Sequence, residues 1–151
     1  MNYAGFWKRY FARLVDSLLV VPLFIINSYF FAAKNENLYS LFITIINILV
    51  ILYMTLSVFF TGKTIGKKAM GLKVQKTNGD KVTLINSFLR ESFTVINVLF
   101  FILKCFIPGV KSYHMFLTIF LSLEPLAYFF TIKRKALHDF IGDTVVVYDK
   151  V

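Results

Sequence analysis

The chain has 151 residues, of which 58% are hydrophobic and 17% charged, and its mean hydropathy is +0.69. Soluble domains are usually about 45–50% apolar and about 25% charged, so the composition excludes an ordinary soluble domain and favours a membrane protein. The net charge of +9 lies in short stretches between apolar blocks, which is typical of cytoplasmic loops and does not favour a nucleic-acid partner.

Two apolar stretches in the first half of the chain predict transmembrane helices. Residues 12–33 contain Asp16, and no signal-peptide cleavage site follows them, so they are expected to remain as a helix. Residues 38–61 contain no charged side chain and exceed the roughly 20 residues that a helix needs to cross a bilayer.

A pattern with β character follows the second predicted span. Residues 71–84 alternate apolar and polar side chains around Asn78-Gly79, which indicates a β-hairpin. The β-branched run at 144–148 is too short for a helix. We expect it to add a third strand to the hairpin, because two strands alone are marginal in water.

Two further apolar stretches predict the third and fourth spans. Residues 85–107 carry Arg90 near their start, and residues 112–132 are interrupted by Glu124-Pro125 near their middle. The predicted fold class is an all-α membrane protein, a four-helix transmembrane bundle with a small cytoplasmic β-hairpin or three-strand element. The whole chain, 1–151, is expected to form a single domain.

The distribution of lysine and arginine predicts the orientation in the membrane. If both termini are cytoplasmic, 14 of the 17 lysines and arginines lie on that side, and three lie outside: Lys34, Lys104 and Lys111. Because cytoplasmic loops carry an excess of these residues, we expect a multi-pass cell-membrane protein with cytoplasmic N- and C-termini. The expected partners are the lipid bilayer and anionic lipid headgroups.

Three motifs are spread over nearly the whole chain. They are Gly5-Phe6-Trp7-Lys8-Arg9 leading into Arg13-Leu14-Val15-Asp16; Gly62-Lys63-Thr64-Ile65-Gly66-Lys67-Lys68 with Gly71-Leu72-Lys73-Val74 and Arg90; and His138-Asp139 with Gly142 and the run at 144–147. In this order and spacing the chain resembles the RDD family of small bacterial membrane proteins, with Ile65 where the family commonly has proline. The resemblance implies that Arg13, Asp16 and Asp139 are the arginine and two aspartates that name the family. It also implies cation/proton antiport as an activity assigned to some members.

Four charged residues are candidate site residues. Arg13 and Asp16 are three residues apart and share one helix face. Either Asp16 is a cation or proton site, or the pair is a clamp that fixes the first helix against its neighbours. Because Arg13, Asp16, Arg90 and Asp139 all fall at the cytoplasmic ends of their segments, we expect them to meet in one network.

Glu124 and three glycines complete the candidate residues. Glu124 lies near the centre of the fourth predicted span, where an ionised carboxylate is costliest. It is either a protonatable site midway across the membrane or a neutral residue that hydrogen-bonds the helices together. The glycines lie in a basic loop that lacks the first glycine of a P-loop, and they are expected to shape tight backbone bends: Gly62, Gly66 and Gly71.

The first functional hypothesis is transport of a small cation or solute, with cation/proton exchange suggested by the family resemblance. Four short helices scarcely enclose an alternating-access site, so this activity is expected to need a homo-oligomer. The alternative is a non-transporting membrane scaffold or accessory subunit that binds a partner or anionic lipid through its basic cytoplasmic face. No enzyme activity, cofactor or metal site is expected, because the chain shows no nucleophile–base constellation and has one cysteine and two histidines.

Overall fold

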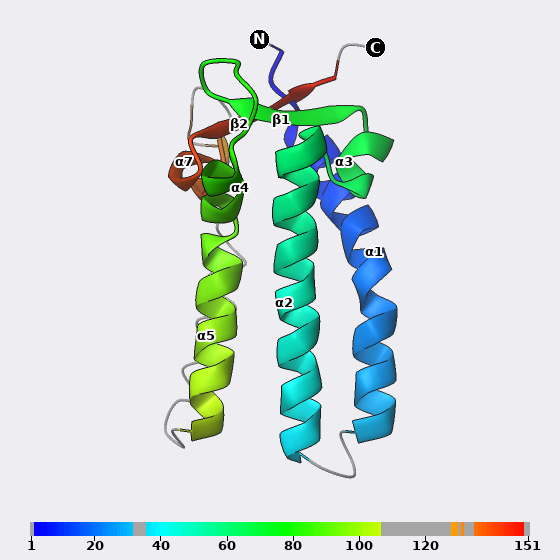
Figure 1. Ribbon diagram of the computed structural model, residues 1–151. Coiled ribbons are helices and arrows are strands. Elements are labelled where there is room, and N and C mark those ends of the chain that lie inside the picture. Colours follow the sequence, from blue (N-terminus) through cyan, green and yellow to red (C-terminus); the bar gives the residue numbers. More distant parts are fainter. Residues whose placement is uncertain (1, 32–35, 107–127, 130, 132–134, 150–151) are drawn as a thin grey trace.

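The computed structural model describes residues 2–31, 36–106, 128–129, 131 and 135–149. The elements are α1 (Phe6–Phe31), α2 (Glu36–Thr61), α3 (Ile65–Ala69), β1 (Leu72–Lys76), α4 (Leu84–Arg90), α5 (Ser92–Phe106), α7 (Leu137–Ile141) and β2 (Thr144–Tyr148). α2 stands between α1 and α5, and the short elements gather, with both ends of the described chain, at one end of these long helices (Figure 1). We call α3, β1, α4, α7 and β2 the cap.

α1 and α2 are long and apolar enough to cross a membrane. Their candidate spans, Phe6–Tyr29 and Leu38–Thr61, each contain 24 residues. Large apolar side chains on α1 point outward, with Leu18 67% exposed and Ile25 62% exposed. Lipid suits such a surface, and a helix satisfies internally the backbone hydrogen bonds that lipid cannot provide. The molecule is therefore a membrane protein with apolar helices.

The third predicted span, 85–107, is wrong as a single helix. α4 and α5 meet at Glu91 with a bend of 57°, so they form a candidate span only as a bent pair. The side chain of Arg90, in the last turn of α4, pairs with Asp139 of α7 at 3.1 Å. This contact holds α4 against α7, and α5 continues in another direction. The fourth predicted span, 112–132, lies outside the described residues except for 128–129 and 131.

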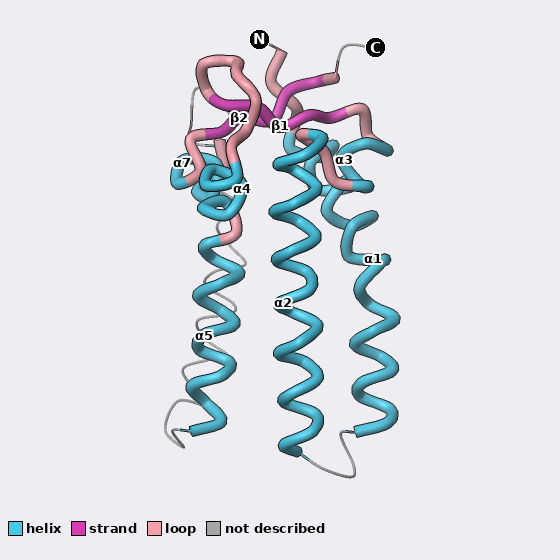
Figure 2. Tube along the Cα trace, viewed as in Figure 1, coloured by secondary structure: helices cyan, strands magenta, loops and turns pink. Residues whose placement is uncertain are grey.

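The sheet pairs segments from distant parts of the chain. β1 is antiparallel to β2, and the register runs from Leu72 opposite Tyr148 to Lys76 opposite Thr144. On the other edge of β2, Tyr3 forms a single antiparallel bridge with Val147. The two strands lie across the ends of the helices (Figure 2). β2, near the C-terminus, is thus paired with both the N-terminal segment and β1, the strand that follows α3.

The predicted hairpin over 71–84 is wrong, although its turn exists. Gly79 has a φ of +98°, and its N–H donates to the Lys76 carbonyl at 2.9 Å. Beyond this turn the chain forms no strand, because Thr83 caps α4 and its side chain accepts a hydrogen bond from the Asn86 N–H. β1 pairs with β2 instead, whose first four residues are buried. The sheet of the described residues has two strands, not the predicted three.

A small apolar core fastens the cap to the long helices. It joins residues from the N-terminal segment, α1, α2, the sheet and the loop before α4: Ala4, Ala12, Val58, Leu72, Val74, Val82 and Val146. Full burial of a valine or leucine side chain stabilises a fold by roughly 1.5–3 kcal/mol. The core therefore fixes the cap over α1 and α2, directly beside the charged residues described next.

Candidate functional site

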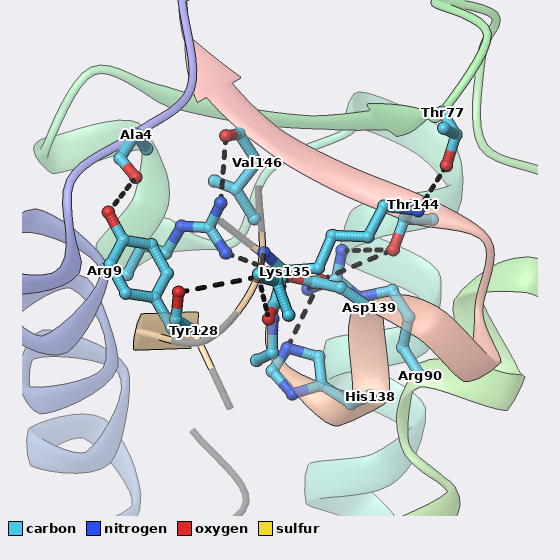
Figure 3. A network of polar contacts seen from close by, with 12 residues as sticks. Ala4, Arg9, Thr77, Arg90, Tyr128, Lys135, His138, Asp139, Thr144 and Val146 are labelled. Atoms are coloured by element: carbon cyan, nitrogen blue, oxygen red, sulfur yellow. Dashed lines mark hydrogen bonds and ion pairs between the residues drawn. The ribbon is translucent and has the colours of Figure 1, made fainter. Parts of the chain in front are cut away.

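Asp139, in α7, is the centre of a buried ionic cluster. Its side chain is 0% exposed; Arg9 Nη1 lies 2.8 Å from its Oδ2, and Arg90 Nη2 lies 3.1 Å from its Oδ1. The Thr144 hydroxyl donates to Oδ1 at 3.4 Å and accepts from Arg90 Nη1 at 3.1 Å. Figure 3 shows these side chains converging from α1, α4, α7 and β2. We call Arg9, Arg90, His138, Asp139 and Thr144 the Asp139 cluster.

The surroundings of Asp139 keep its carboxyl group ionised. Burial alone would raise the pKa of this carboxyl group, but His138, Arg90 and Arg9 outweigh burial and hold the pKa well below its usual range. His138 Nε2 lies 3.4 Å from Oδ1, and the Ala136 N–H donates to Oδ2 at 3.3 Å. Both carboxylate oxygens are therefore charged and occupied at neutral pH.

Asp16, in α1, is the centre of a second buried cluster. It is 2% exposed. Its carboxylate accepts hydrogen bonds from the Thr64 hydroxyl at 2.5 Å, the Gly66 N–H at 2.8 Å and the Tyr53 hydroxyl at 3.3 Å. The Gly66 N–H belongs to the first turn of α3, where backbone donors have no partner within the helix. We call Asp16, Tyr53, Thr64 and Gly66 the Asp16 cluster; it ties α1 and α2 to α3.

The three predicted loop-shaping glycines differ in what they do. Gly62 and Gly71 have φ values of +71° and +64°, the left-handed conformation that bends the chain and favours glycine. Gly66 instead allows close packing of α3 on α1. A Cβ at this position would lie 2.0 Å from the Ala12 carbonyl oxygen and 2.9 Å from Asp16 Cγ. The absence of a side chain lets the Gly66 N–H reach the Asp16 carboxylate.

The structure brings three of the four predicted network residues together. Arg90 contacts Asp139 directly, and Arg13 Nη2 lies 3.3 Å from Nδ1 of His138, whose ring also contacts Asp139. Asp16 belongs to the other cluster, where Tyr53, Thr64 and Gly66 hold it. Glu124 lies outside the described residues.

Five residues of the two clusters are not among the candidate site residues predicted from the sequence: Arg9, Tyr53, Thr64, His138 and Thr144. Arg9 precedes Arg13 by four residues and Asp16 by seven, a spacing that places all three on one helix face. Thr64 precedes a short helix and has the residue type of an N-cap. The sequence pattern could therefore have identified Arg9 and Thr64 as site residues. Tyr53 in an apolar span and Thr144 in a strand are ordinary residues for their elements, and no sequence pattern marks them as site residues.

A cavity of about 590 Å³ lies among the helices beside both clusters. At its cap end the lining is charged: Arg9, Arg13, Asp16, Lys67, Arg90 and Glu91. Between the long helices the lining is mainly apolar and includes Val20, Val21, Phe24, Val50 and Met54. The cavity is therefore amphipathic, with its charges gathered at the cap.

Lys67, in α3, is a cavity cation with an unusual environment. Within the part of the chain that the structure describes, no carboxylate lies within ion-pair distance of its ammonium group. Burial and the nearby Arg90 lower the pKa of Lys67 to about 8, although Asp16 and Glu91 act in the opposite direction. A shielded cation without a counter-ion costs folding free energy. Lys67 is thus not explained by a stabilising role.

Two long helices with apolar outer surfaces, joined at one end by a polar cap that buries charged residues, define a helical membrane protein. Within this class, the molecule is distinguished by an α1 arginine and an α4 arginine that both pair with one α7 aspartate. The chain belongs to the RDD family, whose sequence profile matches residues 3–143. The resemblance inferred from the three motifs is thereby confirmed.

Three proteins of Bacillus subtilis (strain 168) are similar to this chain. Uncharacterized protein YckC is 30% identical over 147 residues, which cover 96% of this chain and 84% of YckC. Uncharacterized protein YxaI is 30% identical over 167 residues, covering 96% of this chain and 97% of YxaI. Uncharacterized membrane protein YteJ is 29% identical over 160 residues, covering 99% of this chain and 83% of YteJ. No solved structure gives a significant match.

Proposed function

We propose that this protein is a non-transporting, multi-pass membrane scaffold or accessory subunit that binds an anionic partner at its basic end. The observation that carries the proposal is the occupancy of its two buried aspartates. Asp16 and Asp139 are 2% and 0% exposed, and every one of their carboxylate oxygens accepts a hydrogen bond from this chain. Carboxylates in this state act as clamps between elements.

A transported cation would have to displace these donors. At Asp139 it would also meet the guanidinium groups of Arg9 and Arg90, which repel it. Breaking a buried ion pair typically costs about 3–5 kcal/mol, because it leaves an uncompensated charge. The two aspartates therefore make poor cation sites and good structural ones.

The same proposal places the cap in the cytoplasm. Of the twelve lysines and arginines among the described residues, eleven belong to the cap, its loops or the first two turns of α1, and the other is Lys104. This asymmetry supports a cytoplasmic cap. Both ends of the described chain lie in or beside the cap (Figure 1), so the number of membrane crossings must be even. The four spans expected from the sequence satisfy this condition.

Cation/proton exchange is the second candidate function, and Lys67 is the observation that favours it. A pKa of about 8 beside a cavity would let this ammonium group release and regain a proton near neutral pH. The three arginines at the same end of the cavity, Arg9, Arg13 and Arg90, oppose this function, since they disfavour a bound cation. Such exchange would also need a homo-oligomer to complete a path across the membrane.

Proteoliposomes that contain the purified chain test the proposal directly. An imposed sodium or potassium gradient should produce no change in internal pH beyond that of empty liposomes. In parallel, the isosteric variant Asp16→Asn should lower the thermal unfolding midpoint of the protein. A cation-dependent pH change that Asp16→Asn abolishes without changing the unfolding midpoint would overturn the scaffold proposal in favour of transport.

A further inference from the structure

Two short helices of the cap, α4 and α7, turn polar side chains inward and apolar side chains outward. In α4 the buried side chains are those of Ser87 and Arg90, and the exposed ones are all apolar: Leu84, Ile85, Phe88 and Leu89. In α7 the buried side chain is that of Asp139, and the exposed ones are again apolar: Leu137, Phe140 and Ile141. A surface helix of a soluble domain has the opposite arrangement, so the exposed faces of α4 and α7 do not fit water.

The two helices present their apolar side chains as one surface, because their polar sides are closed against each other. Arg90 of α4 pairs with Asp139 of α7 at 3.1 Å, and Asn86 Nδ2 donates to the Gly142 carbonyl at 2.9 Å. The packing is tight, since a Cβ at Gly142 would lie 2.4 Å from Arg90 Cγ. We call the seven exposed apolar residues of α4 and α7 the outer face of the cap.

The turn that precedes α4 shows where the apolar surroundings end. Its exposed residues are polar or glycine: Asn78, Gly79, Asp80, Lys81 and Thr83. Figure 1 shows this turn farther from the long helices than α4. A boundary between polar and apolar surroundings therefore passes between the turn and α4.

Trp7, in the first turn of α1, marks the same boundary independently. Its side chain is 68% exposed, and tryptophan is enriched where a membrane meets water. Arg9, two residues further along α1, contacts Asp139 of α7 at 2.8 Å. The first turns of α1 thus lie beside α7, and Trp7 lies near the level of the outer face.

We infer that α4 and α7 are interfacial helices, whose outer face lies at the boundary between lipid headgroups and acyl chains on the cap side of the membrane. Helices of this kind bury their apolar face by about 5–10 Å at that boundary. The placement explains the inward position of Arg90 and Asp139, because a charge turned toward acyl chains costs free energy.

Lipid is the occupant of the outer face because the face continues a surface that already suits lipid. α5 begins at Ser92, directly after the bend at Glu91, and exposes large apolar side chains such as Leu99 and Leu103. α4 and α5 together are long and apolar enough to form one bent candidate span. The lipid that surrounds α5 therefore extends to α4 and, through the contact between α4 and α7, to the whole outer face.

Depth-dependent fluorescence quenching tests the inference, because Trp7 is the single tryptophan of the chain. In a Trp7→Phe background, Phe88→Trp and Phe140→Trp each place one reporter on the outer face. The full-length variants are reconstituted in phosphatidylcholine vesicles whose acyl chains carry bromine either near the carbonyl group or near the chain end. Both reporters should lose more emission to bromine near the carbonyl group.

Two further single-tryptophan variants calibrate this result. Leu18→Trp, on the lipid-facing surface of α1, should lose more emission to bromine near the chain end, and Asn78→Trp, in the exposed turn, should lose little to either label. A Phe88→Trp reporter that behaves like Leu18→Trp would place α4 in the hydrocarbon as part of a transmembrane span. Reporters at Phe88 and Phe140 that lose as little as Asn78→Trp would mean that water or protein covers the outer face. Either result would overturn the inference.

Cysteine labelling provides a second measurement that does not use a tryptophan. In a Cys105→Ser background, Ile85→Cys should react much more slowly than Asn78→Cys with a water-soluble maleimide supplied on both sides of reconstituted vesicles. Ile85 is 72% exposed, so equal rates would place α4 in water and contradict an interfacial helix. Neither measurement involves cation-driven proton flux, so both results are independent of the scaffold proposal.

Discussion

Asp139 takes its partners from two other elements, Arg9 of α1 and Arg90 of α4. Asp139→Asn preserves the shape of this side chain but removes its charge, so both guanidinium groups stay buried without a counter-ion. We expect a loss of about 3–5 kcal/mol in the free energy of unfolding, measured by denaturant or thermal unfolding in detergent. The matched control is Asp149→Asn, whose partner Lys63 is partly exposed; its loss should not exceed about 1 kcal/mol.

The same carboxylate should make the fold sensitive to acid. Its pKa lies below the value near 3.8 of an unfolded aspartate, so the unfolded chain takes up this proton first as the pH falls. The stability that Asp139 contributes is therefore complete above about pH 4 and decreases at lower pH. Unfolding midpoints between pH 3 and pH 6 should show this decrease in the parent chain, and the decrease should be smaller in Asp139→Asn. Identical profiles would refute the assignment.

Lys67 should affect stability in the opposite direction. Its pKa is lowered from 10.5 to about 8, so the folded chain releases a proton that the unfolded chain keeps until higher pH. Stability should therefore rise between pH 8 and pH 10.5, with Arg13, Asp16, Arg90 and Glu91 as the charged groups that act on this lysine. Lys67→Met should gain about 1–2 kcal/mol at pH 7 and lack this rise, whereas exposed Lys68→Met should change neither. A destabilised Lys67→Met would show that the lysine serves the fold.

At the level of elements, the packing of α3 on α1 depends on Gly66. Gly66→Ala places a methyl group 2.0 Å from the Ala12 carbonyl oxygen, a backbone atom that cannot turn aside. α3 must then move away, and the Gly66 N–H leaves the Asp16 carboxylate. We expect a loss of about 3 kcal/mol, at the upper end of overpacking costs, measured as a shift of the unfolding midpoint.

Gly71→Ala is the appropriate control for this change. Gly71 has a φ of +64°, but a Cβ there meets no atom within 4 Å. Gly71→Ala should therefore lower the free energy of unfolding only through the unfavourable left-handed backbone conformation of alanine, by about 1 kcal/mol. A loss in Gly66→Ala no larger than in Gly71→Ala would contradict the proposed contact between α3 and α1.

The sequence was informative about elements where a local pattern decided their structure. The uncharged run at 38–61 indicated a helix, and α2 occupies it. The Asn78-Gly79 turn was also visible, but its hairpin was not formed, because Thr83 initiates a helix and β2 competes for β1. No local pattern records a competition with a strand about seventy residues away.

Site residues, like the helices and strands, were predictable only where a local sequence pattern marked them. Arg90 and Asp139 were selected by motif and charge, and the structure places them 3.1 Å apart. The sequence did not predict that Asp16 binds the backbone of α3, because a backbone N–H donor is not marked by any particular residue type. The bend at Glu91 was hidden for a similar reason. The apolar composition continues beyond it, and the contact that holds α4 at this angle joins Arg90 to Asp139 of α7, about fifty residues away.

For the whole molecule, the decisive property is on which side of the membrane the cap lies. The turn residue Asn78 is exposed in the cap, and the ends of α1 and α2 that flank Lys34 lie opposite the cap (Figure 1). In a Cys105→Ser background, a cysteine introduced by Lys34→Cys should react with a membrane-impermeant maleimide on intact cells. A cysteine introduced by Asn78→Cys should react only after the cells are permeabilised.

This pair of labels distinguishes the orientations because each site serves as the control for the other. Each lysine or arginine near the surface is attracted to the negatively charged cytoplasmic leaflet by about 1 kcal/mol. The summed attraction of the basic residues of the cap therefore exceeds that of the basic residues at the opposite end of the helices. Labelling of Asn78→Cys on intact cells, with Lys34→Cys protected, would reverse the orientation and place the cavity in the outer leaflet. Both sites labelled on intact cells would mean that the helices between them do not cross the bilayer.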